Sequence, residues 1–251
     1  MQNDIKELLK KFYKIKKLGY VKSQRQGHTG IGYTFEKLIG KEEESFCIPD
    51  FNSIEIKTKH KYSKQDLTLI TAEPDSEIVS PVKQLVEKYG YADKNMPKYK
   101  ILNIPLSTTS ATYLGNNIFF KLQVNNKKER IELIIIKNKS KMQTNIYWTF
   151  QMLQERIERK LKHLAIVFAD SKQIKKEEYL YYNEINFYKL KSFNAFISLV
   201  ENGDIKIYIR TGIFKSGKRI GELKNRGTCF KIAINNIEKL YTKICIKGID
   251  Y

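Results

Sequence analysis

Three residues near the start of the chain carry side chains suited to phosphodiester chemistry: Asp50, Glu55 and Lys57. Side chains alternate along a strand, so Glu55 and Lys57 share one face while Ile54 and Ile56 enter a core. Asp50, on the preceding turn or strand, can then be brought beside Glu55. Two adjacent carboxylates repel unless a divalent cation neutralises them, and their oxygens suit Mg²⁺. The spacing predicts a metal site at which Lys57 orients an attacking water or stabilises charge on a phosphoryl group.

A helix predicted to begin near Gly30 supplies a candidate third carboxylate, Glu36. Phe35, Leu38 and Ile39 form the buried stripe of this helix, and Glu36 lies next to that stripe. A solvated helix glutamate fits the pattern equally well. For the carboxylates and lysine of the following segment, the corresponding alternative is an edge strand with solvated charges.

Several separate blocks of the sequence, in one order, extend the pattern. They are His28–Glu36, Pro49–Thr58, Tyr147–Phe150, Lys160–Lys162, Glu201–Lys206, Ile209–Gly212, Ser216–Lys218 and Gly227–Phe230. In these blocks the chain resembles the MvaI/BcnI group of type II restriction endonucleases, in the MutH-type branch of the PD-(D/E)XK nucleases. The resemblance is closest to the MvaI-type members and covers nearly the whole chain. Several blocks in one order are far more specific than one short motif.

The resemblance implies an α/β fold with a mixed central sheet flanked by helices, and two lobes around a DNA cleft. It implies Asp50, Glu55 and the main-chain carbonyl of Ile56 as metal ligands, with Lys57 and Glu36 completing the catalytic set. The cofactor would be Mg²⁺, with Mn²⁺ as a substitute. Residues 1–251 would form one nuclease chain, with approximately 1–150 as the mainly catalytic lobe and approximately 151–251 contributing the DNA-recognition lobe.

The charge of the chain points to a polyanionic partner. Lys and Arg total 46 against 27 Asp and Glu, a formal net charge of +19. Such a charge favours double-stranded DNA as the partner, although a lysine-biased genome gives the same excess. The three cysteines lack C-x-x-C spacing, so neither a disulfide framework nor a zinc site is indicated. No segment has membrane-spanning length, which predicts a cytoplasmic protein without a membrane partner.

Hydrophobic periodicity predicts the main elements. Helices are expected over 3–18, 149–162 and 193–200, strands over 67–71, 164–169 and 205–209, and a hairpin over 118–124 and 130–136. The strand over 67–71 is expected beside the metal site. The aromatic residues between Tyr179 and Tyr188 suit either a core or nucleic-acid stacking. No role is assigned to residues 75–117.

A basic loop lies between the strand over 205–209 and its expected antiparallel partner over 227–233. Its cations are Lys215, Lys218, Arg219, Lys224 and Arg226. A basic loop between two strands can enter a DNA groove, where Arg binds guanine edges bidentately. A solvated hairpin tip is the alternative.

The tip of this loop departs from the resemblance. At Lys224-Asn225-Arg226 the MvaI-type pattern has histidines flanking an aspartate, and at Lys231 it has an arginine. The change removes a cytosine acceptor and adds an amide suited to adenine. We therefore hypothesise that recognition involves Arg210, Asn225, Arg226 and Lys231, and that the target need not be CC(A/T)GG.

The sequence thus predicts a monomeric, Mg²⁺-dependent type II restriction endonuclease that cuts a short duplex sequence. By analogy, a companion DNA methyltransferase would protect the same site. Two alternatives remain open: a MutH-like nicking endonuclease of mismatch repair and a DNA-binding protein without catalysis.

Overall fold

The computed structural model describes residues 1–41, 48–76 and 78–246. The chain forms two compact units and passes between them more than once. Unit 1 comprises Met1–Leu67, Arg156–Ser192 and Ile237–Tyr251, and unit 2 comprises Thr68–Glu155 and Phe193–Asn236. These units do not coincide with two halves of the chain divided near residue 150. Which of them reads DNA stays a prediction.

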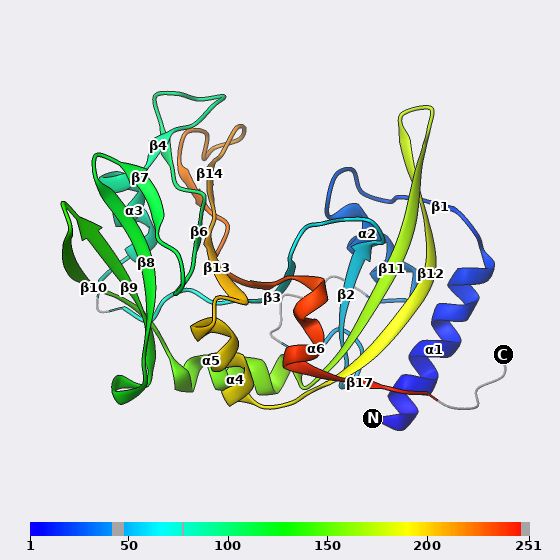
Figure 1. Cartoon of the computed structure of the whole chain (residues 1–251). Coiled ribbons are helices and arrows are strands. Elements are labelled where there is room, and N and C mark those ends of the chain that lie inside the picture. Colours follow the sequence, from blue (N-terminus) through cyan, green and yellow to red (C-terminus); the bar gives the residue numbers. More distant parts are fainter. Residues whose placement is uncertain (42–47, 77, 247–251) are drawn as a thin grey trace. The chain divides into compact units, whose positions relative to one another are not determined.

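Unit 1 is built on a mixed sheet with the strand order β1-β12-β11-β2, and β17 also pairs with β12. The strands are β1 (Val21–Lys22), β2 (Glu55–His60), β11 (His163–Ile174), β12 (Glu177–Leu190) and β17 (Tyr241–Ile244). β2 runs parallel to β11, whereas β12 runs antiparallel to it. Figure 1 shows β11 and β12 as one long hairpin with β2 beside β11. The expected strand over 164–169 is therefore the buried first half of a longer strand.

Two helices share the hydrophobic core of this sheet: α1 (Gln2–Lys17) and α2 (Gly30–Leu38). Ile54 and Ile56 lie in this core at 0% and 5% exposure, which confirms the alternation predicted for the strand. Tyr182 is also in the core, and its hydroxyl donates to the carbonyl of Ile31 at 2.7 Å. Tyr182 is one of the aromatic residues between Tyr179 and Tyr188, and it packs in the core instead of stacking on bases. The short helix α6 (Ile237–Leu240) leads into β17.

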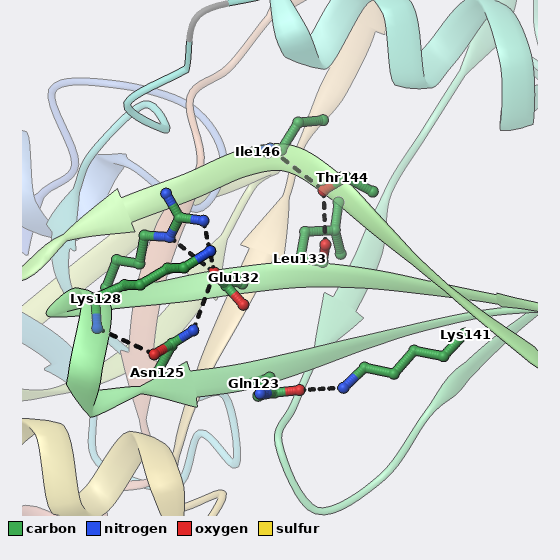
Figure 2. Close-up of polar contacts among 9 residues, drawn as sticks. Gln123, Asn125, Lys128, Glu132, Leu133, Lys141, Thr144 and Ile146 are labelled. Carbon is green, nitrogen blue, oxygen red and sulfur yellow. Dashed lines mark hydrogen bonds and ion pairs between the residues drawn. The ribbon is translucent and has the colours of Figure 1, made fainter.

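Unit 2 contains an antiparallel sheet that confirms the predicted hairpin. Its strands are β7 (Thr112–Gly115), β8 (Ile118–Asn125), β9 (Arg130–Lys137) and β10 (Ser140–Thr149). A 3-10 turn, Asn126–Lys128, joins β8 to β9. Figure 2 shows Asn125 bridging this turn, where its side chain contacts both the N–H of Lys128 (3.1 Å) and the carboxylate of Glu132 (3.3 Å). Arg130 binds the same carboxylate at 2.7 Å, so the buried Glu132 has a charged partner.

A second sheet of unit 2 has the order β3-β16-β13-β6. Its strands are β3 (Leu67–Thr71), β6 (Ile104–Leu106), β13 (Ile205–Ile209) and β16 (Cys229–Ile232). β13 and β16 pair antiparallel, as predicted. The strand predicted over 67–71 is confirmed as β3, which pairs with β16 and not with β2; its expected place beside the metal site stays a prediction. A local pattern defines a strand but does not choose its partner.

The remaining elements of unit 2 include α5 (Phe193–Glu201) and the start of α4 (Phe150–Leu161), both close to their predicted bounds. The region left without a role holds α3 (Pro81–Tyr89), β4 (Tyr91–Ala92) and β5 (Lys100–Ile101). The basic loop is itself a hairpin of β14 (Thr211–Ile213) and β15 (Leu223–Asn225). Among the described residues, no helix combines the length and apolar character that crossing a bilayer requires.

Candidate active site

A tight turn brings Asp50 beside the start of β2. Phe51 and Ile54 exchange both backbone hydrogen bonds, at 2.9 and 2.8 Å, so the chain reverses across two residues. Asn52 in this turn has φ of 49°, a left-handed conformation that Asn tolerates better than most residues. The reversal places the Asp50 carboxylate where it accepts the N–H of Ile56 at 2.9 Å. The spacing of the motif follows from this turn.

The Asp50 carboxylate is held in its charged form by several donors. Lys41 forms an ion pair with one oxygen, and the N–H of Ile56 donates to the other. Burial disfavours the carboxylate, but these hydrogen bonds and the charge of Lys57 lower its pKa below the ordinary value. Asp50 is therefore ionised at neutral pH.

Glu55 differs from Asp50 because it is almost completely buried, with a side-chain exposure of 1%. Burial raises its pKa, and the charge of Asp50 adds to the rise, while Lys57 and Lys160 oppose it. Lys57 forms an ion pair with Oε1 of Glu55, and Lys160 lies 3.4 Å from the same atom. Oε2 of Glu55 is buried and has no hydrogen-bond partner within the part of the chain that the structure describes. A buried carboxylate oxygen without a partner is costly unless another ligand takes it up.

Three further residues belong to this site and were missed by sequence reasoning: Lys41, Lys160 and Tyr241. Lys160 comes from α4, more than one hundred positions after Glu55 in the chain, and its only signal was its place in a block of the resemblance. Tyr241 is fully buried, and burial together with the charge of Glu55 raises the pKa of its hydroxyl. No local pattern identifies such partners, because the fold brings them together.

Glu36 lies on α2, half-buried, on the side of the helix that faces β2. The distances around Gly32, one turn earlier in α2, show this. A Cβ added at Gly32 would lie 3.3 Å from Oγ1 of Thr58 in β2 and 3.9 Å from a carboxylate oxygen of Glu36, so Glu36 and Thr58 are close to the same point. Among the described residues, no group of three or more His, Cys, Asp or Glu side chains is close enough to hold a metal ion. The structure therefore brings together Asp50, Glu55 and Lys57, but it does not gather Glu36 with the two other carboxylates into one ligand cluster.

Most of the residues predicted to bind DNA lie on the β14–β15 hairpin of unit 2. Exposed side chains there are Lys215, Lys218, Arg219, Lys224, Asn225 and Arg226, while Arg210 and Lys231 are half-buried. Phe214 underlies the cations of this hairpin, with Arg219 at 4.1 Å and Lys224 at 5.3 Å from its ring centre. The hairpin is a compact positively charged surface.

Comparison with known proteins identifies the family of this chain. A model of the MvaI/BcnI restriction endonuclease family matches residues 9–241. The chain belongs to the MvaI/BcnI restriction endonuclease family. It is thus a type II restriction endonuclease, a site-specific deoxyribonuclease, with a mixed α/β fold of the PD-(D/E)XK type.

Solved structures of this family agree with the match. The structure of restriction endonuclease MvaI with its cognate DNA substrate is similar, with a TM-score of 0.89 and 31% sequence identity over 97% of this chain and 98% of MvaI. The structure of MvaI in the absence of DNA gives a TM-score of 0.60 at the same identity and coverage. No curated protein gave a significant match.

Proposed function

We propose that this member of the MvaI/BcnI family hydrolyses phosphodiester bonds at a short duplex DNA sequence, with Mg²⁺ as its cofactor. The observation that carries the proposal is the convergence of Asp50, Glu55 and Lys57 on one turn and strand, with one buried oxygen of Glu55 left without a partner. Oε2 of Glu132, which pairs with Arg130, is also without a hydrogen-bond partner in the described chain, so the open oxygen of Glu55 supports a cation site only together with the neighbouring Asp50 carboxylate.

The donor set fits a hard divalent cation. Asp50 and Glu55 offer carboxylate oxygens, and the main-chain carbonyl of Ile56 is the third proposed ligand. Once bound, Mg²⁺, or Mn²⁺ in its place, supplies Lewis-acid activation of the phosphate and of the attacking water. Glu36, on the helix next to β2, would act as an accessory carboxylate outside the ligand pair.

The lysines of the site have distinct proposed roles. Lys57 pairs with Glu55 and keeps 22% of its side chain exposed, so its ammonium would be accessible to an incoming phosphate. There it orients the attacking water or stabilises negative charge in the transition state. Lys160 is 26% exposed and lies 3.4 Å from Glu55, which favours a role in keeping Glu55 ionised. Lys41 does the same for Asp50.

The test is cleavage of unmethylated plasmid DNA by the purified chain, with Mg²⁺, Mn²⁺, Ca²⁺ or a chelator. We expect discrete double-strand fragments with Mg²⁺ and with Mn²⁺, and none with chelator. Mapping the fragment ends gives the recognition sequence. Nicking of one strand only, or dependence on a partner protein, would instead support the MutH-like alternative. Binding without cleavage under every condition would support a non-catalytic DNA-binding protein.

Lys160 should assist the reaction without being essential. We predict that Lys160→Ala lowers the rate of cleavage about tenfold or less, because Lys57 still compensates the charge of Glu55. The loss should shrink as pH rises, since removing a cation raises the pKa of Glu55 further and higher pH restores its ionised form. Lys162→Ala, which removes an exposed lysine two positions along the chain, is the matched control. Equal losses in both variants at every pH would contradict this role.

The β14–β15 hairpin is proposed to read the DNA, with Arg210, Asn225, Arg226 and Lys231 as candidate contacts to base edges. We predict that Arg226→Ala relaxes sequence choice at a cost of about 1–3 kcal/mol in discrimination. Lys215→Ala and Lys218→Ala should instead weaken binding to all sequences and flatten its salt dependence. Fragment mapping and salt titrations of binding measure the two effects. If Arg226→Ala cuts the same sites with unchanged selectivity, the hairpin tip is not the reader.

Two further features of the proposal come from the analogy with restriction systems. A companion DNA methyltransferase would modify the same duplex sequence, so methylated target DNA from the same cells would resist the purified enzyme. The nuclease itself would act as a monomer in the cytoplasm. Light scattering of the enzyme with and without DNA gives the oligomeric state.

A further inference from the structure

Glu73 of unit 2 makes two contacts with the end of the hairpin. Its Oε2 accepts a hydrogen bond from the side-chain amide of Asn225 at 3.1 Å, and its Oε1 accepts one from the main-chain N–H of Thr228 at 3.2 Å. The segment Asn225–Thr228 links β15 to β16. One carboxylate, more than 150 positions earlier in the chain, therefore holds both ends of this link.

The side chain of Asn225 makes two hydrogen bonds within the protein. Its side-chain oxygen accepts the N–H of Gly227 at 2.9 Å, and its amide nitrogen donates to Glu73. These two contacts define the orientation of the amide, with its oxygen toward Gly227 and its nitrogen toward Glu73. Asn225, hypothesised to read adenine, therefore also supports the turn.

Gly227 allows the link to lie close to the strand that precedes Glu73. Its φ is +77°, and a Cβ there would lie 2.4 Å from Cγ2 of Thr71. Any larger residue would push the link away from Thr71. The contact places the link within reach of Glu73, two positions further on.

Arg210 and Arg226 have different surroundings on this link. The guanidinium of Arg210 donates from Nη2 to the carbonyl of Arg226 at 2.8 Å and from Nε to that of Gly227 at 3.2 Å. Arg226 is exposed, and its guanidinium lies over Gly212, where an added Cβ would be 2.9 Å from Nη2 and 3.0 Å from Nε. Two guanidinium nitrogens of Arg210 bond the backbone of the link, which weakens its candidacy as a contact to base edges, whereas Arg226 is exposed and lies against Gly212.

We propose that Glu73 is a positioning residue for sequence recognition, which fixes the link Asn225–Thr228 so that Arg226 is presented to a base edge. The inference rests on the proposed reading of DNA by the hairpin. Glu73 holds the link from the side of β3, and Arg210 holds the carbonyls of the same link. A bidentate contact between Arg and guanine demands a fixed approach, so a loosened link loses discrimination before it loses general affinity.

The chemistry of the two contacts explains why a carboxylate is needed. Both partners of Glu73 are N–H donors, and a carboxylate accepts from both. A glutamine has one acceptor oxygen, so its amide nitrogen would face one of the two donors. Asn225 cannot flip to relieve this clash without breaking its bond to Gly227. Glu73→Gln therefore removes one contact while keeping the size of the side chain.

The experiment compares Glu73→Gln with Glu222→Gln in the wild-type background. Glu222 is an exposed acid on the same hairpin that bonds Arg219 at 2.6 Å, so its variant removes the same charge without touching the link. For each enzyme, kcat/KM is measured on the mapped target and on duplexes that differ from it by one base pair. We expect Glu73→Gln to lower the preference for the target about tenfold, with Glu222→Gln unchanged.

Two measurements separate positioning from other roles. Asn225→Ala should lower selectivity at the base pair that Arg226 reads, beyond any contact of its own, and at that base pair the double variant Glu73→Gln/Asn225→Ala should be no worse than the more affected single variant, because both act on one link. A thermal unfolding midpoint equal to that of the wild type shows that Glu73→Gln folds normally. Additive losses, or a change confined to one base pair that Arg226 does not read, would overturn the inference.

The outcome also distinguishes this inference from the proposed function. If the proposed function fails, the wild type does not cut DNA with Mg²⁺ and no selectivity is measured. If the wild type cuts and Glu73→Gln keeps its full selectivity, the proposed function stands and the positioning role is rejected.

Discussion

Replacing Asp50 or Glu55 by Ala will abolish DNA cleavage while DNA binding in the presence of Ca²⁺ remains close to that of the wild type. Each carboxylate is a proposed ligand of the cation, so its loss removes the activation of phosphate and water. Binding depends mainly on phosphate contacts made by the basic surface, which both variants keep. Single-turnover cleavage and a filter-binding or anisotropy titration measure the two properties on the same preparations.

The isosteric variants Asp50→Asn and Glu55→Gln guard against misfolding. Glu55 is buried between Lys57 and Lys160, and its truncation leaves two cations without their carboxylate. Glu55→Gln keeps the volume of the side chain and removes its charge, so loss of cleavage in a folded Glu55→Gln enzyme reflects the missing carboxylate and not a cavity. Cleavage at the wild-type rate by either Ala variant would end the assignment of these residues as the metal site.

The second large effect is expected at Lys57. Lys57→Ala should lower the rate of the chemical step by about two orders of magnitude or more, the size expected for one well-placed donor to transition-state charge. Lys57→Arg should not restore the rate, because a planar guanidinium does not replace a compact ammonium beside the buried Glu55. Single-turnover kinetics at saturating enzyme separate this loss from any change in binding.

A control for this prediction lies just beyond the same strand. Lys61 is exposed, and its alanine variant removes a lysine near the site without removing a contact to Glu55. Lys61→Ala should cut DNA at nearly the wild-type rate. Full activity in Lys57→Arg would mean that Lys57 contributes only a positive charge.

Part of the site could be predicted from the sequence because it depends on neighbours along the chain. The alternation of Ile54 and Ile56 with Glu55 and Lys57 follows from the period of a strand, and both isoleucines are indeed buried. The return of Asp50 toward Glu55 depends on a turn of two residues. The β8–β9 and β13–β16 pairs were predictable for the same reason, since their strands carry strong local patterns.

The remainder depended on tertiary structure, because it involves residues distant in sequence. Lys160 reaches Glu55 from α4. Glu73, the second residue after the end of β3, reaches the end of the β14–β15 hairpin. No periodicity in either segment specifies its partner, because side-chain contacts between remote segments are set by the packing of the whole unit. The same reason placed β3 in a sheet of unit 2, although its own residues predicted only that it is a strand.

By itself, the sequence determined the residue pattern of the candidate site: two carboxylates and a lysine close together in the chain, together with a basic hairpin, while the reaction class came from the family resemblance. Tertiary structure alone decided how those groups are held. It buries Glu55 against Lys57 and Lys160, leaves one oxygen of Glu55 without a partner in the described chain, and joins Glu73 to the link Asn225–Thr228. The physical reason is that residue type and spacing specify which interactions a segment can make, whereas desolvation and contacts between distant segments exist only once the chain is folded.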